Sequence, residues 1–227
     1  MRLRNDHGRR RCRRLLLVDD HPILREGFAR LIDHESDLKV CGQADNPTKA
    51  LAAIPTLKPD LVIVDIALKG MMGMELIKRI KGIHPEVPVL VLSVLDEGLF
   101  AERTLRAGAK GYVMKQAAAE EVMGAIRRVL RGGRYLSRKM QERMLENLAS
   151  GTPAGSAPGV ECLSDRELEV FQLVGRGCGT RQIAEQLRLS IKTIETYRAH
   201  IKEKLKLRNA MELIRSAMKT ASEREHL

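Results

Sequence analysis

Short apolar runs alternate with amphipathic segments along the first two thirds of the chain. Five of these runs are short enough to be strands, and they lie at residues 14–20, 38–44, 60–65, 88–93 and 110–114. The segments between them place apolar residues three or four positions apart, as a helix that packs on a sheet requires. Strands that alternate with helices through short loops form a doubly wound parallel sheet. We therefore predict an α/β domain with five parallel strands over residues 14–131.

The last third of the chain has no strand pattern and instead predicts four helices, at residues 164–177, 179–189, 190–207 and 209–221. Ser164 and Glu167 have the spacing of a capping box, which marks the start of a helix. The second and third helices are separated by a short turn, and two helices joined in this way form a helix-turn-helix.

The two regions are joined by a segment of different composition. Residues 137–149 predict one further helix, and residues 150–159 are rich in Gly, Pro, Ser and Ala, as flexible linkers are. The predicted organisation is a tail (1–13), an α/β domain (14–131), a helix with a linker (132–159) and an all-α domain (160–227).

Positive charge is concentrated in two places rather than spread over the chain. The formal net charge is +11; residues 1–14 hold seven Arg against one Asp, and residues 188–208 hold seven basic against two acidic residues. A local basic stripe on a predicted helix favours a polyanionic partner, most simply nucleic acid. The four cysteines have no zinc or disulfide spacing, and no run of eighteen apolar residues exists, so we expect a cytoplasmic protein without a membrane span.

Polar side chains follow the apolar strands at the points where the strands end. Asp19 and Asp20 follow the first strand, Asp65 the third, Ser93 the fourth and Lys115 the fifth. Because the carboxyl ends of parallel strands share one edge of the sheet, we expect these side chains to lie together. Three carboxylates need counter-charge, which a lysine and a hard divalent cation such as Mg²⁺ supply.

This set of residues resembles the receiver domain of bacterial response regulators over about residues 14–131. The resemblance implies a flavodoxin-like fold in which Asp65 accepts a phosphoryl group from a phosphohistidine of a sensor histidine kinase. It also implies that Mg²⁺ is bound by Asp65, by Asp20 directly, by Asp19 through water and by the backbone carbonyl of Ala67. The protein then modifies itself and turns over no outside substrate, so we do not expect an enzyme.

The same resemblance assigns three supporting residues and shows two departures. Ser93 would bind the phosphoryl group, Lys115 would pair with a phosphoryl oxygen, and Tyr112 would be the switch aromatic that turns inward. Lys69 stands where Pro is common in the family, and Met72 where Asn or Asp is frequent. We expect Lys69 either to change the phosphoryl lifetime or to be an exposed turn residue of no consequence.

The C-terminal region, from about residue 163 to 217, resembles the LuxR-type DNA-binding domain, with the recognition helix in "SIKTIETYRAHIKEKL". Its predicted buried stripe is Ile191, Ile194, Tyr197, Ile201 and Leu205. Predicted phosphate contacts are Thr180, Arg181, Lys192, Arg198, Lys202 and Arg208, and Thr193 lies on the same outer face. Glu195, Thr196 and Ala199 are candidate base readers, although Glu195 has the alternative of pairing with Arg188 or Arg198. The last helix has an apolar face of Met211, Leu213, Ile214, Ala217 and Met218. Part of this face must belong to the core, and the resemblance implies that the rest forms a homodimer contact.

A receiver followed by a LuxR-type domain resembles a NarL/FixJ-type two-component response regulator, which regulates transcription; RNA polymerase is a further candidate partner. Two other functions compete with this interpretation. A constitutive DNA-binding protein with a vestigial receiver would need a broken acceptor site, whereas the charged residues of the site are all present. An aspartate-nucleophile phosphatase would need a second acid at position 67, where this chain has Ala67.

Overall fold

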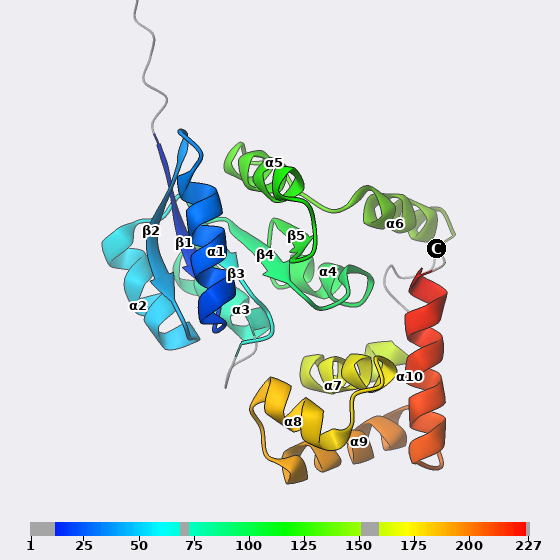
Figure 1. Ribbon diagram of the computed structural model, residues 1–227. Coiled ribbons are helices and arrows are strands. Elements are labelled where there is room, and N and C mark those ends of the chain that lie inside the picture. Colours follow the sequence, from blue (N-terminus) through cyan, green and yellow to red (C-terminus); the bar gives the residue numbers. More distant parts are fainter. Residues whose placement is uncertain (1–11, 69–72, 151–158, 226–227) are drawn as a thin grey trace, which may run out of the picture.

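The structure, a computed structural model, describes residues 12–68, 73–150 and 159–225 (Figure 1). Lys69 and Met72, most of the basic tail and most of the predicted linker lie outside these residues. Among the described helices, none is long and apolar enough to cross a membrane.

The predicted five-stranded parallel sheet is confirmed. Its strands are β1 (Arg13–Val18), β2 (Leu38–Ala44), β3 (Leu61–Val64), β4 (Val89–Ser93) and β5 (Gly111–Met114). All neighbouring pairs are parallel, in the order β2-β1-β3-β4-β5. The order reverses between β1 and β3, so their carboxyl ends flank the switch point where ligands bind in such sheets.

Helices cover both faces of the sheet, as the apolar spacing predicts. They are α1 (Pro22–Asp33), α2 (Pro47–Leu57), α3 (Gly73–Ile83), α4 (Glu97–Arg106) and α5 (Ala119–Leu130). Alternate strand residues face opposite sides: Leu15 and Ile63 pack with α1 and α5, whereas Leu16 and Val62 pack with α2, α3 and α4. Gly73 opens α3 where a Cβ atom would lie 2.4 Å from the Asp65 carbonyl oxygen, so this close approach requires glycine.

The C-terminal region is all α-helical. After α6 (Arg138–Ser150) and a short 3-10 turn η1 (Val160–Cys162) come α7 (Asp165–Gly175), α8 (Thr180–Leu187), α9 (Ile191–Lys204) and α10 (Ala210–Glu225). The capping box of Ser164 and Glu167 is present at the start of α7, and Ser190 caps α9. The helix-turn-helix is therefore α8 and α9.

One prediction about the recognition helix α9 is wrong. Ile194 and Ile201 are fully buried, but Ile191 is 47% exposed. Ile191 is the first residue of α9, and the first turn of the helix extends beyond the core that Ile194 and Ile201 fill.

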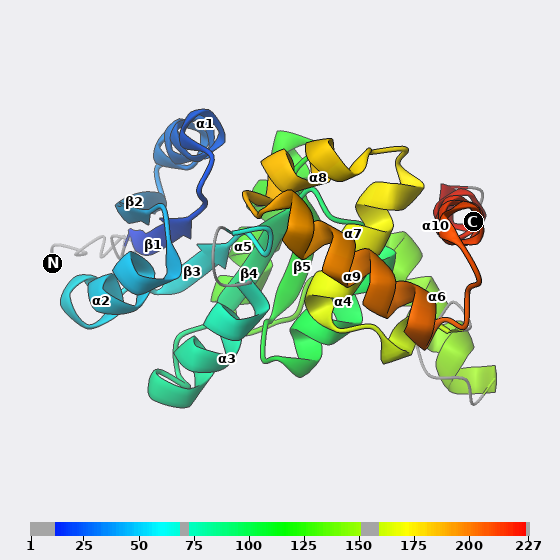
Figure 2. The same cartoon turned by 90° about the horizontal axis from the view of Figure 1, so that it is seen from below.

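The helical domain packs against the α/β domain through α7, which lies between α4 and α9 in Figure 1, whereas α9 lies in front in the view from below (Figure 2). The apolar cluster on the α4 side of the sheet continues without a break into the helical domain, where Leu163, Leu168 and Phe171 belong to it. On the other side of α4, α6 is attached by Arg143, whose guanidinium donates to the Gly98 carbonyl oxygen at 2.6 Å.

Candidate functional site

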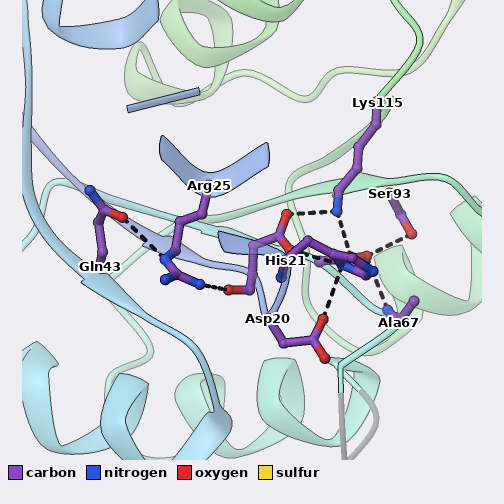
Figure 3. Close-up of polar contacts among 9 residues, drawn as sticks. Asp20, His21, Arg25, Gln43, Ala67, Ser93 and Lys115 are labelled. Atoms are coloured by element: carbon purple, nitrogen blue, oxygen red, sulfur yellow. Dashed lines mark hydrogen bonds and ion pairs between the residues drawn. The ribbon is translucent and has the colours of Figure 1, made fainter. Parts of the chain in front are cut away.

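The strand-end residues predicted to gather do so around the carboxylate of Asp65, which both Ser93 and Lys115 contact. Figure 3 shows Asp20, Ser93 and Lys115 pointing toward one another. Asp65 is 2% exposed. Its Oδ2 pairs with Lys115 Nζ at 2.6 Å, and its Oδ1 accepts from Ser93 Oγ at 2.9 Å and from the Ala67 backbone N–H at 3.0 Å. A buried carboxylate is costly unless it is paired and hydrogen-bonded, and these three donors meet that condition.

Lys115 is the counter-charge of the pocket. Its ammonium group also lies 2.6 Å from Asp19 Oδ2, so one cation joins the end of β1 to the end of β3. Burial acts to lower the pKa of Lys115, but the charges of Asp65 and Asp19 outweigh it and raise the pKa above its ordinary value. Lys115 therefore stays charged, as the neutralising role requires.

The donor set fits a hard divalent cation. Carboxylate oxygens of Asp19, Asp20 and Asp65 and a ring nitrogen of His21 lie within 4.8 Å of one another, the one such group among the described residues. Mg²⁺ binds one or two carboxylates and keeps several waters, so the buried Asp20 and Asp65 suit it. The carbonyl of Ala67 stays a predicted ligand.

Two residues of the pocket were missed by the sequence reasoning. His21 Nδ1 lies 3.3 Å from Asp19 and 3.1 Å from Asp20, and the Arg25 guanidinium donates to the Asp19 backbone carbonyl oxygen at 2.5 Å and to Gln43 Oε1 at 3.1 Å. The position of His21 directly after the two acids could have indicated its place in the pocket. Nothing in the sequence indicates that of Arg25, because one turn of α1 separates it from the acids.

Tyr112 already has the orientation that phosphorylation was expected to produce. The side chain is fully buried, and its hydroxyl donates to the Leu95 carbonyl oxygen at 2.8 Å. Burial raises the pKa of Tyr112 well above its ordinary value, so the hydroxyl stays a donor. The structure therefore shows Tyr112 already facing inward, and it shows no outward orientation from which phosphorylation would turn the ring.

The predicted DNA-contacting residues lie along α9 and at the start of α8, except Arg208, which lies between α9 and α10. Lys192, Glu195, Thr196 and Ala199 are exposed, as are Arg181 and Arg208, whereas Thr180, Thr193, Arg198 and Lys202 are half-buried. Arg198 donates to Thr180 Oγ1 at 3.3 Å, which joins the two helices of the motif. In the described part of the chain Glu195 has no ion pair, so its alternative pairing with Arg188 or Arg198 is not formed.

A buried, lysine-paired aspartate at the switch point of a five-stranded parallel sheet, followed by a helix-turn-helix, defines a DNA-binding response regulator of the two-component type. Residues 15–127 match the family described as "Response regulator receiver domain", and residues 161–217 match "Bacterial regulatory proteins, luxR family". The chain belongs to the LuxR-type response regulators, a non-enzymatic kind of family.

Individual relatives agree with this assignment. The chain is 32% identical over 210 residues to the Oxygen regulatory protein NreC of Staphylococcus aureus, an alignment that covers 91% of this chain and 97% of that protein. A two-component response regulator of the LuxR family from Aurantimonas sp. SI85-9A1 is similar in structure, with a TM-score of 0.57 and 32% identity over 60% of this chain and 98% of that chain. The RcsB response regulator of Salmonella enterica serovar Typhimurium, bound to the promoter P1flhDC, has a TM-score of 0.56 and 26% identity over 90% of this chain and 97% of that chain.

Proposed function

We propose that Asp65 accepts a phosphoryl group from the phosphohistidine of a sensor histidine kinase and that this modification controls binding of the protein to promoter DNA. The observation that supports this most directly is the Asp65 carboxylate, which is buried yet held by Lys115, Ser93 and the Ala67 N–H. A paired carboxylate of this kind is already a nucleophile, so the transfer needs no general base.

The chemistry needs little from the protein beyond position and charge. An Asp65 oxygen forms a bond to phosphorus while the bond from phosphorus to the imidazole nitrogen breaks, and its electron pair passes to the imidazole. Lys115 offsets the negative charge at Asp65, and Ser93 offers a hydroxyl to a phosphoryl oxygen. Mg²⁺, when held by Asp19, Asp20, Asp65 and the Ala67 carbonyl, would supply further positive charge.

DNA recognition is proposed for α9, in the major groove. Six residues would contact phosphates and set the register: Thr180, Arg181, Lys192, Arg198, Lys202 and Arg208. Glu195, Thr196 and Ala199, all exposed, would reach base edges, with Thr193 beside them. The α10 residues Met211 and Met218, 58% and 53% exposed, would form the homodimer contact that binding to paired half-sites needs.

The test is phosphorylation with a small phosphodonor, acetyl phosphate, in the presence of Mg²⁺. We expect intact mass spectrometry to show one added phosphoryl group on the wild type and none on Asp65→Asn, and DNA-affinity sequencing to recover promoter fragments from the phosphorylated protein. Asp45→Asn is the matched control, because Asp45 also follows a strand, β2, but lies at the sheet edge. A phosphoryl group on Asp65→Asn would contradict the assignment.

A constitutive DNA-binding protein is the second candidate, and the buried orientation of Tyr112 favours it. In that case, wild type and Asp65→Asn would recover the same DNA fragments equally well whether or not acetyl phosphate is added. The intact pocket around Asp65 favours the first function over this one.

A further inference from the structure

Helix α7 of the DNA-binding domain is attached to the two loops that follow the phosphorylation pocket. The Arg166 guanidinium donates to the Leu68 carbonyl oxygen at 3.2 Å, and that of Arg176 donates to the Val94 carbonyl oxygen at 3.0 Å. Leu68 is three residues after Asp65, and Val94 directly follows Ser93. The pocket and the DNA-binding domain are therefore separated by a few residues of backbone.

A third arginine fixes the same interface from the α/β domain. Arg103 of α4 donates to the carbonyl oxygens of Leu163 and Val160 at 2.8 and 3.1 Å, and it pairs with Asp165 Oδ1 at 3.0 Å. Together with the apolar cluster shared by α4 and α7, these contacts hold the two domains in one closed arrangement.

A buried acid lies in this interface. Glu169 is on α7, is 0% exposed, and pairs through Oε2 with Arg166 at 2.6 Å. Its other oxygen, Oε1, is buried and has no hydrogen-bond partner among the described residues. Burial, together with the negative charges of Asp65 and Asp165, raises the pKa of Glu169 to about 7 despite the opposing effect of Arg166. Arg166, which pairs with Glu169, also donates to the Leu68 carbonyl oxygen three residues after Asp65, so this arginine connects Glu169 to the loop of the pocket.

We propose that Glu169 is the residue through which the DNA-binding domain senses negative charge at Asp65. This inference rests on the proposed phosphorylation of Asp65. A phosphoryl group adds negative charge there, which repels the Glu169 carboxylate and attracts Arg166 away from it. A buried carboxylate that loses its cation is strongly destabilising, so α7 leaves the loops and the closed arrangement opens. Glu169 acts through the interface and takes no part in phosphoryl transfer.

The test compares wild type with Glu169→Gln, which keeps the size of the side chain and removes its charge. Both proteins are treated with Mg²⁺ and beryllofluoride, a phosphoryl mimic, and amide hydrogen exchange is measured over α4 and α7. Acetyl phosphate labelling with intact mass spectrometry shows separately whether Asp65 is modified. Glu185→Gln, an exposed acid on α8, is the control for an equal charge change in the same domain, and thermal unfolding shows that each variant folds.

We expect beryllofluoride to speed exchange over α4 and α7 on the order of tenfold in wild type and in Glu185→Gln, within the usual range of coupling between sites. In Glu169→Gln the same treatment should speed exchange over α4 and α7 less than threefold, about half of the wild-type effect when both are expressed as free energies. Asp65 should still be labelled in this variant. Equal acceleration in all three proteins, or none in wild type, overturns the role of Glu169. Absence of labelling on wild-type Asp65 overturns the proposed function and this inference with it.

Discussion

Two buried carboxylates, Asp65 in the α/β domain and Glu169 in the helical domain, are satisfied to different degrees. Asp65 has donors on both oxygens, one of them the Lys115 ammonium group. Glu169 has Arg166 on one oxygen and nothing on the other among the described residues. A carboxylate with donors on both oxygens is stable when buried, whereas one that depends on a single cation becomes costly as soon as that cation moves away.

The largest effect is expected when Asp65 loses its cation, Lys115. We expect Lys115→Met to lower the free energy of unfolding by about 3 kcal/mol in urea denaturation with EDTA, because Asp19 and Asp65 then share a buried site without their lysine. Mg²⁺ should restore part of the loss. Lys39→Met, at an exposed ion pair with Asp33, should cost less than about 1 kcal/mol, and an equal loss in the two variants would contradict this account of Lys115.

The position of Glu169 depends on α7 being held by α10. At Gly175 of α7 a Cβ atom would lie 2.6 Å from the Ala217 carbonyl oxygen, so Gly175→Ala should push the two helices apart and lower the free energy of unfolding by about 2 kcal/mol. Gly124→Ala in α5, where nothing lies within 4 Å of the added atom, should instead stabilise by up to about 1 kcal/mol. The measurement is chemical denaturation of both variants, and a Gly175→Ala protein as stable as wild type would show that contact with α10 is unimportant.

The closed arrangement can be weakened without touching either carboxylate. Arg103→Ala removes three contacts to the start of the helical domain, and we expect the open population to rise about tenfold, the equivalent of one charged hydrogen bond. Faster amide hydrogen exchange over α7 measures it. Arg106→Ala, one turn along α4 and 73% exposed, is the control and should leave that exchange rate unchanged.

The smallest effect is a dependence of domain closure on pH. Because the closed structure raises the pKa of Glu169 to about 7 from its ordinary 4.5, protonation favours the closed form, and closure is lost as the pH rises through that window. The charged groups that act on Glu169 are Arg166 and Asp165 on its own helix and Asp65 opposite. Between about pH 6 and about pH 8 we expect at most about a tenfold rise in the open population, by amide exchange corrected for its intrinsic pH dependence. If the corrected exchange rate of the wild type changed as little over this pH range as that of Glu169→Gln, the effect would be ruled out.

The sequence was sufficient for the sheet and for most of the pocket, because both follow from local pattern. Strand ends are visible as apolar runs that stop at a polar residue, and parallel topology then brings Asp19, Asp65 and Lys115 together. His21 was within reach of the same reasoning. The orientation of Tyr112 was not, because the ring belongs to an apolar strand in either orientation.

The domain interface could not be predicted from the sequence. Arg103, Arg166 and Arg176 look like ordinary charged positions of amphipathic helices, and their acceptors are backbone carbonyl oxygens that leave no trace in residue identity. Glu169 has the same appearance, since its burial comes from a second domain rather than from its own helix. Ile191 is the opposite case: apolar spacing predicts that it is buried, but it is exposed, because the buried residues of α9 begin one turn later, at Ile194.

The acceptors that hold α7, the carbonyl oxygens of Leu68 and Val94, belong to the main chain. These two hydrogen bonds therefore do not depend on which side chains the loops carry. At these two points the DNA-binding domain depends on the backbone of the receiver, whereas Arg103 and the apolar cluster of α4 join it to particular receiver side chains. A chimaera that joins this helical domain to the receiver of a relative should therefore keep the two backbone contacts, but it should close fully only where that receiver also carries an arginine at the position of Arg103.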